Sequence, residues 1–337
     1  MKPTILRRTA AVLAACLLLS LPAAADNQSL SYWEIENIAS EYDNISEDFL
    51  DELYRSSDRN DMVSVEDFQD LAQEHRVKLE FIQRFFPNHL VYSDYGRHIY
   101  DPVDTSLPLS NYPRENFTKY SNGEITYTSP EGVVALKGID VSKYQGDIDW
   151  ERVKADGVDF AIIRLGYRGY TKGQIFLDPR WQENIEGALD AGVQVGVYFF
   201  SQAIDEEEAV EEALTVLDCI EGYDITFPVV YDVEEAGASN ARTNGLSVSQ
   251  RTANTIAFCD TIANAGYRPM IYSYTRVLAA MLDLSQLTQY DKWVAQYYAA
   301  PFFPYEYQIW QYSSTGRVDG INGNVDMNLS FVDYGAL

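Results

Sequence analysis

Basic residues are scarce in this sequence. Its 337 residues include 25 Lys and Arg against 51 Asp and Glu, which gives a formal net charge of −26. Such an excess of negative charge repels the phosphate backbone of nucleic acids, and no local cluster of basic residues offsets it. We therefore expect no nucleic-acid partner.

Histidine is rarer still, and its few positions bear on metal binding. The three histidines are His75, His89 and His98. All lie in the first third of the chain, away from the acidic motifs described below, so a zinc site is not expected. We expect no metal and no cofactor, although a magnesium or calcium site made of oxygen ligands alone stays open.

Long apolar runs are absent after the N-terminal segment. The first 25 residues combine a basic start, an apolar run from Ala10 to Leu21 and small residues up to Ala25. The run is shorter than the roughly 20 residues that cross a bilayer, and this order of features is typical of an export signal cleaved near Ala25. A lipoprotein signal with a lipid anchor at Cys16 is the less favoured alternative, because the apolar run continues beyond it. We expect an exported protein with no transmembrane span in the mature chain.

Cysteine is also rare, with three in the whole chain. Cleavage near Ala25 would remove Cys16 and leave Cys219 and Cys259. These two are able to form a disulfide in an oxidising compartment, but both lie within helical patterns and are equally compatible with buried free thiols.

The remaining chain divides into regions of different pattern. Residues 26–100 show mainly helical periodicity and predict a small N-terminal domain of unknown role. Residues 101–136 are rich in Pro, Asn and Gly and are typical of a turn-rich connector. Residues 137–337 alternate between helical stretches that end at glycine and short apolar runs. This alternation predicts βα units around a parallel sheet.

Eight strand-like runs in the last region predict a closed barrel. They are Lys137–Val141, Phe160–Ile163, Val193–Phe200, Phe227–Tyr231, Met270–Tyr272, Trp293–Tyr297, Tyr307–Tyr312 and Val325–Phe331. After Tyr274 there is little room for full helices between them. We therefore expect an α/β protein with an irregular TIM-like (β/α) barrel that is poor in helices around its last three strands.

Acidic residues stand at the ends of several of these runs. Residues two apart on a strand share a face, so Asp232 and Glu234 are both expected to point into the barrel mouth. Two adjacent carboxyl groups at the end of a buried strand disfavour each other's ionisation, and glycoside hydrolysis uses such a pair. By itself the Asp-x-Glu pattern is also compatible with a solvated surface pair. Asp140 and Asp326 lie near the ends of two other runs.

Aromatic and amide side chains accompany these acids. Tyr and Trp offer a flat apolar face with a polar tip, which suits contact with sugars. Four groups of such residues fall at predicted strand ends, around Tyr198, Tyr272, Trp293 and Trp310. Any one of them is also compatible with a core position, but together they favour a sugar-binding cleft.

At this level of detail the chain resembles glycoside hydrolase family 25, a family of lysozymes that act as N-acetylmuramidases. The resemblance covers about residues 137–332 and rests on ordered motifs at Gly138–Gly146, Phe160–Arg164, Gly196–Phe200, Tyr231–Glu234 and Val325–Asn328. It implies that Glu234 is the proton donor and Asp232 the second carboxylate, with Asp140 and Asp326 as flanking acids. Many members have His where this chain has Phe199, which bears on substrate contacts and not on the carboxylates.

The resemblance also implies a barrel whose last three strands lack regular helices, and hydrolysis with retention. Whether Asp232 or the substrate's acetamido group acts as nucleophile stays open. The residues expected to bind substrate are Arg164, Tyr198, Tyr272, Trp293, Gln296, Trp310 and Gln311. The expected partner is the glycan strand of peptidoglycan, cut at the β-1,4 bond between N-acetylmuramic acid and N-acetylglucosamine by a secreted or cell-wall-associated enzyme. The alternatives are an inactive wall-binding protein and a glycosidase for another N-acetylated glycan, such as chitin.

Overall fold

A computed structural model describes residues 29–337. The chain divides into two compact units, and the boundary between them along the sequence falls between Val77 and Lys78. The export signal expected at residues 1–25 and the alternative lipid site at Cys16 lie outside the described residues. Sequence patterning placed a domain boundary near residue 100, whereas residues 78–136 group with the barrel in the structure.

The described part of the first unit is small and mainly helical. A two-stranded antiparallel sheet of β1 (Ser29–Ser31) and β2 (Met62–Ser64) accompanies three helices. The helices are α1 (Tyr32–Ala39), α2 (Glu47–Ser56) and α3 (Val65–Glu74). Ser46 and Ser64 cap α2 and α3 by accepting hydrogen bonds from backbone N–H groups. Phe49 and Phe68 are fully buried and contact each other edge to face, so this unit has a core of its own.

Residues 78–135 precede the barrel within the second unit. They form α4 (Leu79–Gln83), the hairpin of β3 (His89–Asp94) and β4 (Arg97–Pro102), and the pair β5 (Phe117–Lys119) and β6 (Ile125–Tyr127). Tyr112 attaches this segment to the barrel: its ring stacks on Phe331 at 3.8 Å and its hydroxyl donates to the carbonyl of Tyr307.

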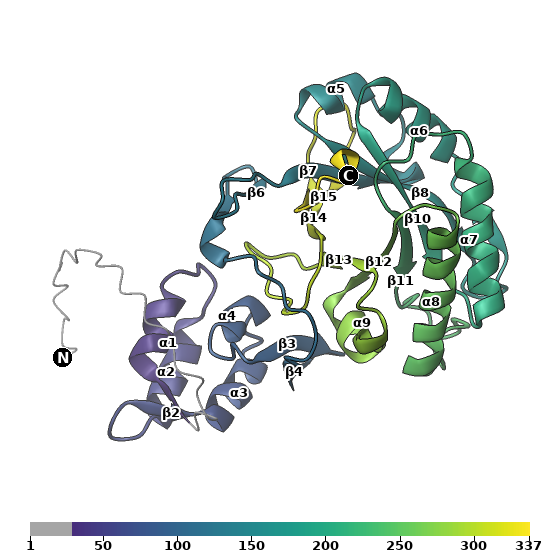
Figure 1. Cartoon of the computed structure of the whole chain (residues 1–337). Coiled ribbons are helices and arrows are strands. Elements are labelled where there is room, and N and C mark those ends of the chain that lie inside the picture. The colour runs from purple at the N-terminus through teal and green to yellow at the C-terminus, as the bar shows by residue number, and fades with distance from the viewer. Residues whose placement is uncertain (1–28) are drawn as a thin grey trace. The chain divides into compact units, whose positions relative to one another are not determined.

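Eight strands close into a barrel, as the sequence predicts (Figure 1). They are β7 (Leu136–Val141), β8 (Phe160–Arg168), β10 (Gln194–Ser201), β11 (Val229–Val233), β12 (Pro269–Tyr274), β13 (Asp291–Ala295), β14 (Ile309–Gly316) and β15 (Val325–Ser330). Pairing of β8 with both β7 and β10 closes the circle, and β9 (Ile175–Leu177) is added antiparallel to β8.

The helices are unevenly distributed around the barrel, which is also as predicted. Helices α5 (Trp150–Ala155), α6 (Trp181–Asp190), α7 (Glu206–Ile220), α8 (Val248–Asn264) and α9 (Thr275–Ala280) lie outside the strands (Figure 1). No α-helix follows α9 in the part of the chain that the structure describes. Gly192 and Gly266, just after α6 and α8, have φ of 74° and 90°, the left-handed conformation that ends a helix.

One strand departs from the expected parallel arrangement. Strand β15 pairs antiparallel with both β14 and β7. Only eight residues connect β14 to β15, too few for the crossover that a parallel partner requires. The first residues of β15 therefore lie at the same end of the barrel as the last residues of the parallel strands. This direction pairs Asp326 with Asp140 across the sheet.

Large apolar side chains fill the interior of the barrel. Phe160 and Phe227 stack at 4.4 Å, and Met270 and Ile309 are fully buried in the same cluster. Gly138 makes room for this packing, because a Cβ atom there would lie 2.1 Å from the ring of Phe160.

The structure also shows the state of the two remaining cysteines and whether any described helix could span a membrane. Cys219 and Cys259 are free thiols. Within residues 29–337, every helix is too short or too polar to cross a membrane.

Candidate active site

Two carboxyl groups meet at the end of strand β11. Asp232 is buried within the strand, and Glu234 follows directly after its last residue, Val233. Both acids line one cavity inside the barrel, whereas Val233 between them packs in the core on the other face of the sheet. Their carboxyl groups are within hydrogen-bonding reach of each other. The sequence prediction that this pair shares one face agrees with the structure.

Burial and mutual repulsion make it costly to ionise this pair. Burial raises the pKa of both carboxyl groups, and the charge of Glu234 raises the pKa of Asp232 further. The pair therefore keeps one proton to a higher pH than an isolated carboxyl would, and that proton belongs to the pair as a unit. Arg164 opposes the rise at Asp232 but does not cancel it.

Asp140 and Asp326 form the opposite wall of the same site, as partners in the β7–β15 ladder. Burial raises the pKa of Asp326 to about 6. Burial, followed by the charge of Asp326, also raises the pKa of Asp140 well above its usual range. The structure thus brings together all four acids that the sequence singled out: Asp140, Asp232, Glu234 and Asp326 line one cavity of about 260 Å³.

A hydrogen-bond network holds Asp140 in place. Its Oδ2 accepts from Gln311 Nε2 at 2.8 Å and from Asn328 Nδ2 at 2.9 Å. Trp293 Nε1 donates to Asn328 Oδ1 at 2.9 Å. An indole N–H only donates, so it fixes which end of the Asn328 amide faces Asp140. The network therefore presents donors to Asp140 and opposes the rise in its pKa.

Aromatic side chains complete the cavity. Tyr198, Tyr272, Trp293 and Gln311, all expected from the sequence, line it together with Tyr297. The hydroxyls of Tyr272 and Tyr297 both donate to Gln311 Oε1, at 2.9 and 2.7 Å. Tyr297 is 51% exposed, so its ring is open to a ligand.

Two residues of this site were not selected from the sequence. Asn328 is two residues after Asp326 and so shares its face, a spacing that the sequence already contained. Tyr297 lies beyond the end of β13, where strand periodicity no longer indicates a direction.

Three residues expected to bind substrate lie outside this cavity. Trp310 is fully buried, and its Nε1 donates to the carbonyl of Gln296 at 2.8 Å. Because it neighbours Gln311 on β14, its side chain faces the other side of the sheet, away from the four acids. Arg164 instead contacts the fully buried Asp178 through its Nε, at 2.8 Å, and through its terminal nitrogen. Gln296 lines a neighbouring groove, described below.

The oxygen-ligand metal site that the sequence left open has no counterpart among the described residues. Within residues 29–337, no group of three or more His, Cys, Asp or Glu side chains is arranged to hold a metal ion.

Comparison with known proteins places this geometry in a family. A family model described as glycosyl hydrolases family 25 matches residues 139–321. The chain belongs to glycoside hydrolase family 25. The matched residues run from β7 into the turn before β15, so they include three of the four clustered acids, and Asp326 follows five residues later.

Two proteins that are named lysozymes are similar to part of this chain. The chain is 30% identical to an autolytic lysozyme of Clostridium acetobutylicum over 194 residues, 57% of this chain and 55% of that protein. It is 30% identical to lysozyme M1 of Streptomyces globisporus over 211 residues, 59% and 69% of the two chains. The chain thus spans little more than half the length of the clostridial relative.

A solved structure shows the same fold. The bacterial lysozyme from Streptomyces coelicolor aligns with a TM-score of 0.50 and 28% identity, covering 60% of this chain and 94% of that one. The family match and this alignment support the identification made from the sequence motifs.

Proposed function

We propose that this protein is an exported muramidase that hydrolyses the β-1,4 bond between N-acetylmuramic acid and N-acetylglucosamine in peptidoglycan. The barrel, residues 137–337, would carry the catalysis. The observation that supports this most directly is the pair of adjacent carboxyl groups, Asp232 and Glu234, in an aromatic-lined cavity. Family membership and the relatives that are named lysozymes support the same reaction.

In this proposal Glu234 is the general acid. Asp232 is 4% exposed, whereas Glu234 is only partly buried and lines both the acidic cavity and the adjoining groove. Glu234 is therefore the member of the pair that a glycosidic oxygen is able to reach. It would protonate that oxygen as the bond breaks and then, as the base, activate the water that completes hydrolysis.

The remaining acids would stabilise the positive charge that develops at the anomeric carbon. Asp232 lies beside the donor, and Asp140 is held as a hydrogen-bond acceptor by Gln311 and Asn328. A fixed, buried negative charge is worth more than a solvated one, because it needs no reorganisation during the reaction.

The closeness of the two carboxyl groups supports retention of configuration. Inverting enzymes separate the two by roughly 6.5–9.5 Å to admit a water molecule, whereas Asp232 and Glu234 are within hydrogen-bonding reach. Retention through Asp232 as nucleophile and retention through the substrate's acetamido oxygen are both compatible with this arrangement.

Substitution of the proposed acid tests the mechanism. Glu234→Gln keeps the size of the side chain but removes the transferable proton, so turnover on purified peptidoglycan should fall by roughly 10²–10⁴. Release of reducing ends measures it. Glu151→Gln is the matched control, since Glu151 is exposed on α5 and should leave the rate unchanged. Release by Glu234→Gln at the parent rate would show that another group is the acid.

The product distinguishes the alternative functions. New reducing-end N-acetylmuramic acid identifies a muramidase, whereas faster release from chitin identifies a glycosidase of different specificity. Binding to peptidoglycan without any product would identify a wall-binding protein that has lost catalysis.

Export is proposed from the N-terminal segment alone. Mass spectrometry of the protein from the culture medium or cell wall should find an N-terminus near Asp26. A lipid-modified N-terminus at Cys16 would instead establish the lipoprotein alternative.

A further inference from the structure

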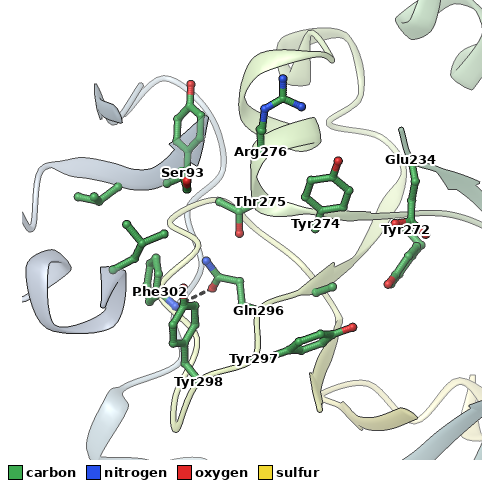
Figure 2. A pocket seen from close by; sticks show the side chains of 14 residues that line it. Ser93, Glu234, Tyr272, Tyr274, Thr275, Arg276, Gln296, Tyr297, Tyr298 and Phe302 are labelled. Carbon is green, nitrogen blue, oxygen red and sulfur yellow. Dashed lines mark hydrogen bonds between the residues drawn. The ribbon is translucent and has the colours of Figure 1, made fainter. Parts of the chain in front are cut away.

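A second hollow adjoins the acidic cavity. It has a volume of about 490 Å³, within the usual range for ligand sites. Glu234, Tyr272 and Tyr297 line both spaces, so the two are continuous at the proposed acid. Figure 2 shows Ser93 and Phe302 on one side of this groove and Glu234 and Tyr272 on the other.

One wall of the groove comes from outside the matched family region. Leu79 of α4 and Val91, Tyr92 and Ser93 of β3 form it, whereas the family match begins at residue 139. The remaining lining residues belong to the barrel. The segment before the barrel therefore extends the site beyond what the family region supplies.

A cluster of Asp94, Tyr95, Glu235 and Arg276, called the clamp below, holds this wall against the loop that carries Glu234. Arg276 Nε donates to Asp94 Oδ1 at 2.6 Å, and the same guanidinium contacts Glu235, the residue after the proposed acid. The ring of Tyr95 lies 4.2 Å from that guanidinium, and its hydroxyl donates to Glu235 Oε1 at 2.8 Å. The tip of the β3–β4 hairpin is thus tied directly to the active-site loop.

The clamp also decides which charges the groove offers. Arg276 is the one basic side chain among the lining residues, and both Asp94 and Glu235 neutralise it. The other charged lining group is the acid Glu234. The groove therefore has no uncompensated positive charge to attract an anionic ligand such as a carboxylate-bearing stem peptide.

An unsatisfied amide points to a ligand with a hydrogen-bond acceptor. Gln296 is 4% exposed, and its Oε1 accepts from the backbone N–H groups of Phe302 and Phe303 at 2.9 and 3.0 Å. These two donors fix the amide orientation, so its Nε2 is the free end, and it has no hydrogen-bond partner. A buried donor without a partner is costly, and a bound acceptor would remove that cost.

We propose that the groove binds an uncharged N-acetylated sugar of the glycan strand beyond the scissile bond, with Gln296 Nε2 donating to it and residues 79–93 forming one wall. Tyr297 and Tyr298 supply aromatic faces for the sugar ring, and the half-buried Leu79 supplies apolar surface. The identity of the ligand rests on the proposed function, whereas the groove itself does not.

Binding of oligosaccharides of increasing length tests this inference without requiring hydrolysis. The probes are N-acetylglucosamine oligomers of two to six units, titrated calorimetrically into the full chain carrying Glu234→Gln. Affinity should rise as the oligomer becomes long enough to extend into the groove. Ser93→Trp, which would fill the groove, should weaken binding of the hexamer roughly tenfold or more and bind the dimer with a smaller loss.

Two further variants make the result specific. Ser121→Trp is the matched control, because Ser121 is exposed in the β5–β6 turn and away from the groove, so binding should be unchanged. Gln296→Glu keeps the acceptor for the two backbone N–H groups but removes the donor. It should also weaken the hexamer, and thermal unfolding should confirm that each variant is folded.

Hexamer affinity unchanged by Ser93→Trp in a folded protein would overturn the proposal. A second outcome would also overturn it. If the protein bound peptide-bearing muropeptides more tightly than peptide-free glycan, and if Ser93→Trp abolished that preference, a peptide would be the occupant of the groove. Failure of peptidoglycan hydrolysis by the parent protein is a separate outcome. It would refute the proposed function and leave the binding measurement intact.

Discussion

The clustered acids should make the barrel less stable as pH rises, and Asp326→Asn should reveal this. Burial raises the pKa of Asp326 to about 6 in the folded protein, from the ordinary value of 3.8. Between these values the folded state binds more protons than the unfolded state does. Stability therefore falls as pH rises through this range. Asparagine does not titrate, so Asp326→Asn should not lose this part of its free energy of unfolding as pH rises.

The rise in the pKa of Asp326 determines how much folding stability is lost as pH rises. At about 1.4 kcal/mol per pKa unit, the difference between 3.8 and about 6 corresponds to at most ~3 kcal/mol. Because Asp326 is partly exposed, solvent screening lowers this to roughly 1–2 kcal/mol. The charge of Asp326 also raises the pKa of Asp140, and Asp326→Asn removes this repulsion.

Chemical unfolding at several pH values measures the difference. Four of the five tryptophans, Trp150, Trp181, Trp293 and Trp310, belong to the barrel, so intrinsic fluorescence reports mainly on that unit. The free energy of unfolding of Asp326→Asn minus that of the parent should be smallest at pH 4. It should grow by roughly 1–2 kcal/mol up to pH 7.

A change in packing or hydrogen bonding would add an offset that is the same at every pH, so only the slope tests the reasoning. A difference that stays constant from pH 4 to 7, or that shrinks as pH rises, would refute it. The same variant should have reduced activity on peptidoglycan, since the proposed mechanism uses this charge.

Other substitutions test packing. Gly138→Ala should lower the free energy of unfolding by about 1–3 kcal/mol or more, because its Cβ would collide with the buried ring of Phe160. Gly245→Ala, where a Cβ has open space, should change it by less than about 0.5 kcal/mol, and equal losses in the two would contradict this account. Trp310→Phe should cost about 1–3 kcal/mol in the same unfolding assay through its lost hydrogen bond to Gln296 and lost volume. Its KM for peptidoglycan should stay within about twofold of the parent value. A large rise in KM would show that Trp310 contributes to substrate binding after all.

Much of the barrel was predictable because its signals are local. Strands buried on both faces appear as short apolar runs, and all eight runs became strands of the barrel. The spacing of Asp232 and Glu234 placed both on one face, because side chains alternate along a strand. The scarcity of helices after Tyr274 followed from the short distances between runs.

The errors arose where a local pattern does not indicate direction or face. Aromatic and apolar residues occupy both faces of β14, so composition did not separate Trp310, which faces outward, from Gln311, which faces the acids. The antiparallel direction of β15 depends on barrel closure and on the length of a loop, and not on the residues of the strand itself.

The sequence by itself determined the barrel, the family and the four acids, because these depend on strand periodicity and on ordered motifs within one region. Only the tertiary structure decided which side chains surround those acids. Asp94 and Arg276 are 182 residues apart in the chain, and no periodicity relates them. Their ion pair exists because packing of the β3–β4 hairpin against the barrel brings them together, and that packing forms the groove beside Glu234.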